Sequence, residues 1–188
     1  FTEAHLRGVR ACGWRSSSSI AVQVRALLQQ RHSFIYVYYD GIDKIAHERG
    51  FGEYYDAELR LTDRLVADIA SVLVPGSVLL VTADHGQVDV GTNTSTPHPD
   101  VRALTTYQSG EGRFRWLHTR SGTVDELWSA AQEHHGHEAW VMRRDELIDG
   151  GWFGSRVSDA ARQRLGDVAL IAHAPTSFDD PADSGPFP

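Results

Sequence analysis

Two short segments of the sequence each combine a carboxylate with an imidazole. Asp43 and His47 are four residues apart, a spacing that places both side chains on one side of a helical turn. Asp84 and His85 are adjacent, and Gly86 after them allows the backbone to turn sharply. Carboxylate oxygens and imidazole nitrogens are zinc-type ligands. One Asp and one His from each segment could supply a two-metal cluster with about 3.5 to 4 Å between the ions, which is the arrangement that clamps a phosphoryl group.

Each pair also has a purely structural interpretation. An Asp and a His at this spacing can form a surface ion pair, and an Asp-His-Gly sequence after a strand can be a capping Asp in a turn. The two pairs each follow an apolar run and are separated by one helix. Together they favour a metal site more strongly than either pair does alone.

The elements that must position these pairs are two apolar runs and the helix between them. Residues 34–39 (FIYVYY) and 77–82 (SVLLVT) are β-branched, aromatic and continuous, which predicts buried strands of a parallel α/β sheet. Apolar residues recur with a helical period over 53–73, and Pro75-Gly76 ends that helix. The unit is therefore predicted as strand, right-handed crossover helix and strand, with both pairs at the carboxyl edge of the sheet, where ligands collect.

The remaining patterns predict further α/β structure around a small antiparallel excursion at about residues 91–120. The excursion is a loop followed by a hairpin with strands at 101–107 and 114–118. Thr123 and Glu126 are spaced as a capping box, and one of the serines at 16–19 is expected to cap a helix. The other expected elements are helices at 20–28, 123–132 and 158–165, strands at 139–142 and 167–172, and a loop at 175–188.

Composition sets broad limits on function. The chain has 188 residues, 41% of them hydrophobic, which suits one sizeable core and excludes disorder, collagen and coiled coil. The formal charge of −7 argues against a nucleic-acid polymer as partner, and no apolar run approaches the roughly 20 residues of a membrane span. Cys12 is the one cysteine, so no internal disulfide forms. We expect a cytoplasmic location unless an export signal precedes residue 1.

The two motifs together resemble a known family. The segment 39–50 (YDGIDKIAHERG), followed one helix later by 81–86 (VTADHG), is similar to the metal-binding half of the alkaline phosphatase superfamily, nearest to its nucleotide pyrophosphatase/phosphodiesterase-like branch. The resemblance implies one domain over residues 1–188, with an alkaline-phosphatase-like sheet flanked by helices on both faces and incomplete in this chain. It also implies two divalent metal ions, with zinc expected, one held by Asp43 and His47 and the other by Asp84 and His85.

The resemblance leaves several family positions without a match. The family has a further metal-binding Asp and a Thr or Ser nucleophile upstream, and a last zinc-binding His, usually followed by Gly, in a late loop. His173 is followed by Ala174, so we expect the matching His beyond Pro188. Asp40 is one register too early to be a ligand. The 188 residues are therefore expected to be a piece of a longer enzyme and to be inactive alone.

The other histidines are not predicted to bind a metal ion. His134 and His135 end a predicted helix, where imidazole suits the helix dipole, and His137 follows them, so a metal tract is not expected there. His98 could line the mouth of the site.

The function implied by the resemblance is two-zinc hydrolysis of a phosphoric ester, as a phosphodiesterase or nucleotide pyrophosphatase acting on a small phosphate ester or nucleotide. Phosphonate hydrolysis and phosphomutase chemistry occur on related scaffolds and stay open. The alternative from another class is a non-catalytic α/β binding module that keeps a metal as a structural clip. A structural zinc site would be closed by four ligands of its own. The oligomeric state is not predicted.

Overall fold

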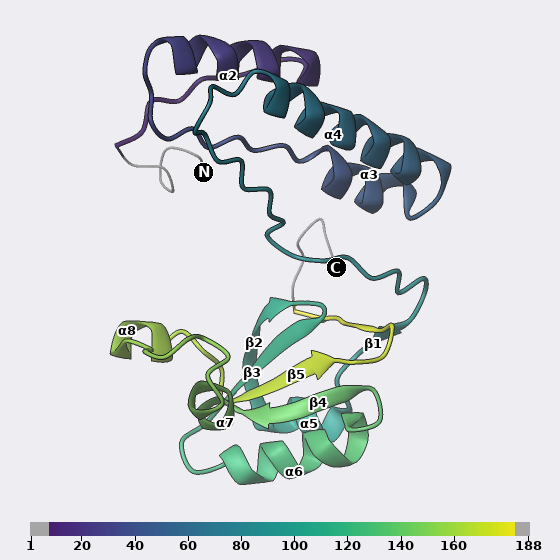
Figure 1. Ribbon diagram of the computed structural model, residues 1–188. Coiled ribbons are helices and arrows are strands. Elements are labelled where there is room, and N and C mark those ends of the chain that lie inside the picture. Colours follow the sequence, from purple (N-terminus) through teal and green to yellow (C-terminus); the bar gives the residue numbers. More distant parts are fainter. Residues whose placement is uncertain (1–7, 183–188) are drawn as a thin grey trace. The chain divides into compact units, whose positions relative to one another are not determined.

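The computed structural model describes residues 8–182 and has a mixed α/β fold. The chain divides into two compact units, with the boundary between Gln87 and Val88. The first unit contains helices, and the second contains the four-stranded sheet (Figure 1). The expectation of one domain over residues 1–188 stays a prediction. The end of the predicted C-terminal loop, residues 183–188, lies outside the described residues.

The first unit is built around α4 (Glu53–Ser71), which contacts both α2 (Ile20–Gln29) and α3 (Gly41–Arg49). A 3-10 turn at Ser17–Ser19 leads into α2. The apolar period of the two longer helices buries Ile20 and Val24 of α2 against Leu65 and Ile69 of α4. These helices were predicted from sequence, and the structure confirms them.

A hydrogen bond holds the start of α3 against α4. The Tyr39 hydroxyl donates a hydrogen bond to Glu58 of α4, and this pair passes directly over Gly41 at the start of α3. A Cβ at Gly41 would meet the Glu58 carboxylate and the Tyr39 hydroxyl, so a larger residue there would displace this hydrogen-bonded pair. At the other end of α3, Gly50 adopts φ 65°, a conformation that favours glycine and turns the chain into α4.

The two predicted strands of this unit are wrong. Residues 34–39 and 77–82 are not strands, and none of the ladders among residues 8–182 includes them. Phe34 is 82% exposed, and Val78 and Leu80 are 90% and 84% exposed. The physical reason is that a strand exists only with a hydrogen-bonding partner, and neither run has one within residues 8–182. A continuous apolar run indicates a preference for burial on two faces, but it does not say which segment would cover those faces.

The second unit contains a four-stranded sheet in the order β2-β3-β5-β4, antiparallel at every pairing. Its strands are β2 (Thr105–Glu111), β3 (Phe114–Thr119), β4 (Ala139–Arg143) and β5 (Val168–Ala172). The predicted antiparallel hairpin is present as β2 and β3, and it joins the larger sheet instead of standing apart. Inside β2, Gly110 adopts φ 89° and lies against the Phe114 carbonyl, where a Cβ would not fit.

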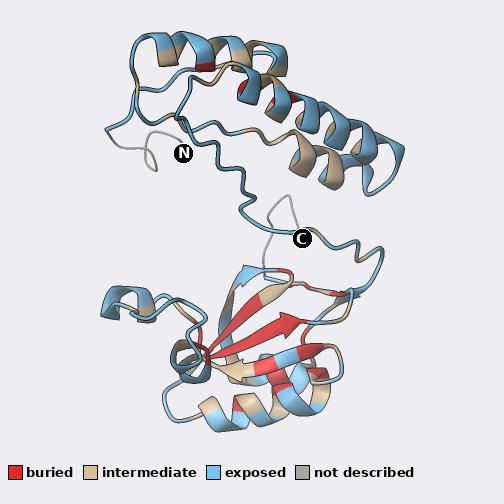
Figure 2. Cartoon of the chain, in the orientation of Figure 1, coloured by how far each residue is buried: buried red, intermediate tan, exposed pale blue. Residues whose placement is uncertain are grey.

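Helices cover both faces of this sheet. Alternate residues of β5 face opposite ways, so Val168 and Leu170 join a core with Leu127 of α6 (Val124–His135), while Ala169 and Ile171 pack with Leu147 of α7 (Arg144–Asp149). Figure 2 shows β5 buried along its length. The continuous apolar run at 168–172 therefore reflects burial on both faces, which antiparallel strands also permit.

The shorter elements complete this unit. The two-residue strands β1 (Thr94–Ser95) and β6 (Ser177–Phe178) form the one parallel pairing within the described part of the chain. Helix α5 (Pro99–Leu104) takes residues predicted to start the hairpin, because His98 caps it and Pro99 suits its first position. Helix α8 (Asp159–Arg162) is capped by the Ser158 side chain.

Two predicted caps are wrong. The Ser19 hydroxyl bonds to the Ser16 carbonyl instead of a helix N–H, so no serine of the run caps α2 through its side chain. The Thr123 hydroxyl bonds to Arg120, so the predicted capping box with Glu126 does not form. In both cases the hydroxyl finds a nearer carbonyl in the preceding turn.

Residues 8–182 form no helix with the length and apolar character that a bilayer crossing demands.

Candidate metal centre

The first pair of predicted ligands lies on α3. Asp43 is in its first turn and His47 is one turn later, with Nε2 of His47 3.5 Å from Oδ1 of Asp43. The helical spacing predicted from sequence is therefore the observed one. Because the hydrogen bond between Tyr39 and Glu58 holds the start of α3 against α4, the Asp43 carboxylate is positioned by the packing of the two helices.

The second pair lies in the loop that follows residues 77–82, and this loop reaches α3. Nε2 of His85 is 3.9 Å from Oδ1 of Asp43 and 3.9 Å from Oδ1 of Asp84. The Asp84 carboxylate also accepts the backbone N–H of His85 at 3.2 Å. The structure thus brings together two motifs about forty residues apart, with Asp43 Oδ1 facing both imidazoles and Asp84 beside His85.

Gln87 is a neighbour of the centre that the sequence did not single out. Its side-chain amide donates to Oδ1 of Asp43 at 3.1 Å, which ties the loop to the helix. A glutamine two residues after His85 gives no metal-ligand signal, so this role follows only from the fold. An orienting donor of this kind fixes a ligating carboxylate from outside the coordination shell.

The charges around the centre are predominantly negative. Desolvation, followed by the charges of Asp40, Asp84 and Asp43, raises the pKa of Tyr38 above its usual 10.0. Lys44 does not offset the Asp43 charge directly, because its ammonium bonds to Asp40 at 2.8 Å, and that bond raises the pKa of Lys44. Asp40 is thus engaged with Lys44 at the start of α3.

The donor set and its spacing fit zinc. Ligand atoms about 2.0 to 2.1 Å from a tetrahedral zinc ion lie about 3.3 Å from one another. The separations within the two pairs, 3.5 Å between Asp43 and His47 and 3.9 Å between Asp84 and His85, need only small side-chain movements to reach that value. The side chains are 43% to 74% exposed, which leaves room for further ligands and for a substrate oxygen. The role of these four residues as metal ligands stays a prediction.

A second group of potential ligands lies in the other unit, and sequence reasoning missed it. Three side chains, His98, Asp100 and His134, each offer one ligand atom within 4.8 Å of the others. His134 and His135 do end α6, as predicted, but the proximity of His134 to His98 depends on packing between α5 and α6. His173, the residue after β5, does not belong to this group. Its backbone N–H donates to the Glu138 carbonyl.

Comparison with known proteins places the chain in a family. The model of the type I phosphodiesterase / nucleotide pyrophosphatase family matches residues 7–185, which is nearly the whole chain. No curated protein matches the sequence. The match includes both motifs of the centre and both units of the fold. The chain therefore belongs to the type I phosphodiesterase / nucleotide pyrophosphatase family, which is part of the alkaline phosphatase superfamily and consists of hydrolases of phosphoric esters.

Proposed function

We propose that this chain supplies the metal-binding half of a two-zinc phosphodiesterase or nucleotide pyrophosphatase. The observation that carries the proposal is the position of Asp43, whose Oδ1 lies 3.5 Å from the His47 imidazole and 3.9 Å from that of His85. One carboxylate therefore joins the two motifs. Two zinc ions held there would act as Lewis acids that offset the charge on a phosphate and lower the pKa of the attacking hydroxyl.

Each residue of the chain has a defined task in this proposal. Asp43 and His47 hold one ion from successive turns of α3, and Asp84 and His85 hold the other from the loop. Gln87 keeps the Asp43 carboxylate aimed at the loop by its 3.1 Å hydrogen bond. The family's attacking Thr or Ser is assigned to no residue of this chain, and we propose that residues 1–188 bind zinc without catalysing turnover.

The exposure of the centre supports the enzyme over the metal-clip alternative. A structural zinc site is closed by protein ligands and excludes water. Here the His47 and Asp84 side chains are 63% and 74% exposed, which is the property of an open site that admits a substrate. A small phosphate ester or nucleotide is the proposed substrate, because the net charge of −7 disfavours a long polyanion.

The test is hydrolysis of bis(4-nitrophenyl) phosphate, in the presence of zinc, by a protein that contains both these residues and the attacking Thr or Ser. We expect Asp84→Ala to abolish turnover and to leave the circular dichroism spectrum unchanged, because the Asp84 side chain is exposed and packs in no core. Asp89→Ala is the matched control, since Asp89 lies in the same loop region and bonds only to Gly91 N among the described residues. Turnover retained by Asp84→Ala with zinc present would overturn the assignment.

A further inference from the structure

The second ligand group is formed where α5 meets α6. His98 caps the start of α5, Asp100 lies in its first turn, and His134 is in the last turn of α6. Oδ2 of Asp100 is 3.4 Å from Nδ1 of His98 and 3.4 Å from Nε2 of His134. Both separations match the roughly 3.3 Å between ligands of a tetrahedral zinc ion.

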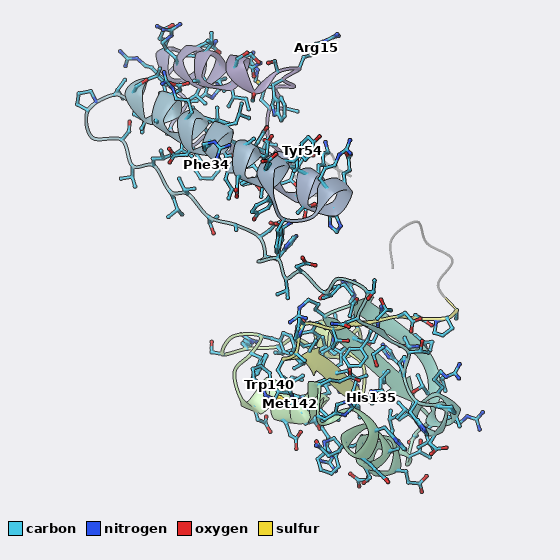
Figure 3. All side chains as sticks on the ribbon, turned by 90° about the vertical axis from the view of Figure 1, so that its right-hand side faces the viewer. Arg15, Phe34, Tyr54, His135, Trp140 and Met142 are labelled. Atoms are coloured by element: carbon cyan, nitrogen blue, oxygen red, sulfur yellow. The ribbon has the colours of Figure 1, made fainter. Side chains whose placement is uncertain are left out.

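A buried histidine fixes the backbone on both sides of this group. His135, which is next to His134 and labelled in Figure 3, is buried, with 4% of its surface exposed, and its Nε2 accepts the backbone N–H of His98 at 3.0 Å. Since Nε2 is an acceptor, the proton is on Nδ1, which donates to Oε1 of Glu138 at 2.8 Å. The Ser95 hydroxyl donates to the same oxygen at 2.9 Å. His98 and His134 are therefore both held by one hydrogen-bonded residue of the core.

The hydrogen-bond acceptors of the group are placed so that a cation could bind between them. Nδ1 of His98 accepts the backbone N–H of Asp100 at 3.3 Å, and in the tautomer that makes this hydrogen bond the nitrogen presents a lone pair. The Asp100 carboxylate, also an acceptor, is 3.4 Å from the same nitrogen. Two acceptors face each other there, and the one hydrogen bond to Nδ1 is long. A bound cation would neutralise the carboxylate and take the Nδ1 lone pair in place of this weak contact.

We propose that His98, Asp100 and His134 form a second zinc site, which uses none of the residues of the Asp43 centre. Two imidazoles and one carboxylate select zinc over calcium or magnesium, whose ligands are oxygens. The side chains of His98 and Asp100 are 41% and 70% exposed, so a fourth position is open to water or an exogenous ligand. An ion at this site links the start of α5 to the end of α6.

The proposal requires a defined movement. The rings of His98 and His134 are stacked, with centroids 3.6 Å apart and 13° between their planes. The lone pairs of stacked imidazoles lie in nearly parallel planes and do not converge on one ion. Binding therefore tilts one ring out of the stack, while His135, whose nitrogens both have partners, stays in place.

The experiment uses the whole chain with zinc chloride. A background variant, His47→Gln/His85→Gln, weakens the Asp43 centre through two exposed side chains. Equilibrium dialysis with atomic spectroscopy then measures zinc per chain. We expect the background to retain one zinc, His134→Gln added to it to lower zinc affinity more than about 100-fold, beyond the effect of a second-shell change, and His137→Gln, a nearby histidine outside the group, to change it little.

Two further measurements keep the test decisive. Asp100→Asn alters an exposed carboxylate, so it reports the loss of a ligand if His134→Gln fails to fold. In ¹H–¹⁵N spectra of the histidine rings, zinc should shift His98 and His134 and leave His135 unchanged. No zinc bound by the background variant, or equal losses in His134→Gln and His137→Gln, would overturn the proposal.

Discussion

Asp43→Asn is the substitution that most sharply probes the proposed centre. Asparagine keeps the shape of the side chain and removes the charge that faces the imidazoles of His47 and His85 at 3.5 and 3.9 Å. The side chain is 43% exposed, so the change should not disturb the core of the first unit. We expect the affinity for both zinc ions to fall, because one carboxylate faces both ligand pairs.

The expected loss can be worked from charge and distance. Two unit charges about 4 Å apart attract by about 1 kcal/mol in water, so a divalent ion at that distance from Asp43 loses about 2 kcal/mol. Since about 1.4 kcal/mol is a tenfold change, this ion should bind about 30-fold more weakly. The ion that Asp43 contacts directly loses a ligand as well, and its affinity should fall by more than the roughly 100-fold limit of second-shell changes.

The assay is zinc titration by isothermal calorimetry on the chain with His134→Gln in the background, which removes the second proposed site. Asp40→Asn is the matched control: it removes the same charge from the start of α3, but its carboxylate is paired with Lys44 at 2.8 Å. We expect the control to change zinc affinity less than about threefold, as for an exposed ion pair. Equal losses in the two variants would show that net charge, and not ligation by Asp43, explains the effect.

Three further predictions address the fold and the field of the centre. Desolvation and the bond to Glu58 raise the pKa of Tyr39 to about 12 from 10.0, so its contribution is present below pH 10 and is lost as pH rises through about 12. Chemical denaturation of wild type and Tyr39→Phe should show that the difference between their unfolding free energies shrinks by about 1 kcal/mol over this pH range. This is less than the ~2.7 kcal/mol expected for an unscreened group. A difference that stays constant with pH would argue against the pKa shift. Leu127→Ala, at a fully buried position, should destabilise the second unit by about 2 to 5 kcal/mol, whereas Leu61→Ala, at a position 44% exposed, should cost under about 0.5 kcal/mol in the same urea titrations. Zinc should lower the pKa of Tyr38, because a cation offsets the carboxylates that raise it. Ultraviolet titration with Tyr38→Phe as reference measures this pKa, and a value that zinc leaves unchanged would contradict the proposal.

Local sequence patterns predicted the elements that bury an apolar face. The apolar periods of α2, α4 and α6 and the run at 168–172 led to helices and a strand close to those observed. The runs at 34–39 and 77–82 have equally strong β composition, yet they remain unpaired among the described residues. Composition indicates a preference for extended backbone. Which strand pairs with such a segment, and which elements bury it, depends on the tertiary fold.

The site shows the same limit in a different way. Asp43 and His47 are four residues apart on one helix, so their proximity follows from helical geometry alone. The approach of His85 could be anticipated only from the expectation that both pairs end neighbouring strands, although the structure achieves it without those strands. His98 and His134 meet because α5 packs on α6, and nothing in the local sequence of either helix signals that contact.

The metal centre proposed for Asp43, His47, Asp84 and His85 can be tested by a crystal structure of the zinc-loaded chain, with anomalous differences collected on both sides of the zinc absorption edge. We expect strong anomalous density bounded by these four side chains, with about 3.5 to 4 Å between two ions when both are bound. An absence of zinc density between α3 and the loop at 84–87, in crystals where these residues are ordered and zinc is in excess, would contradict it.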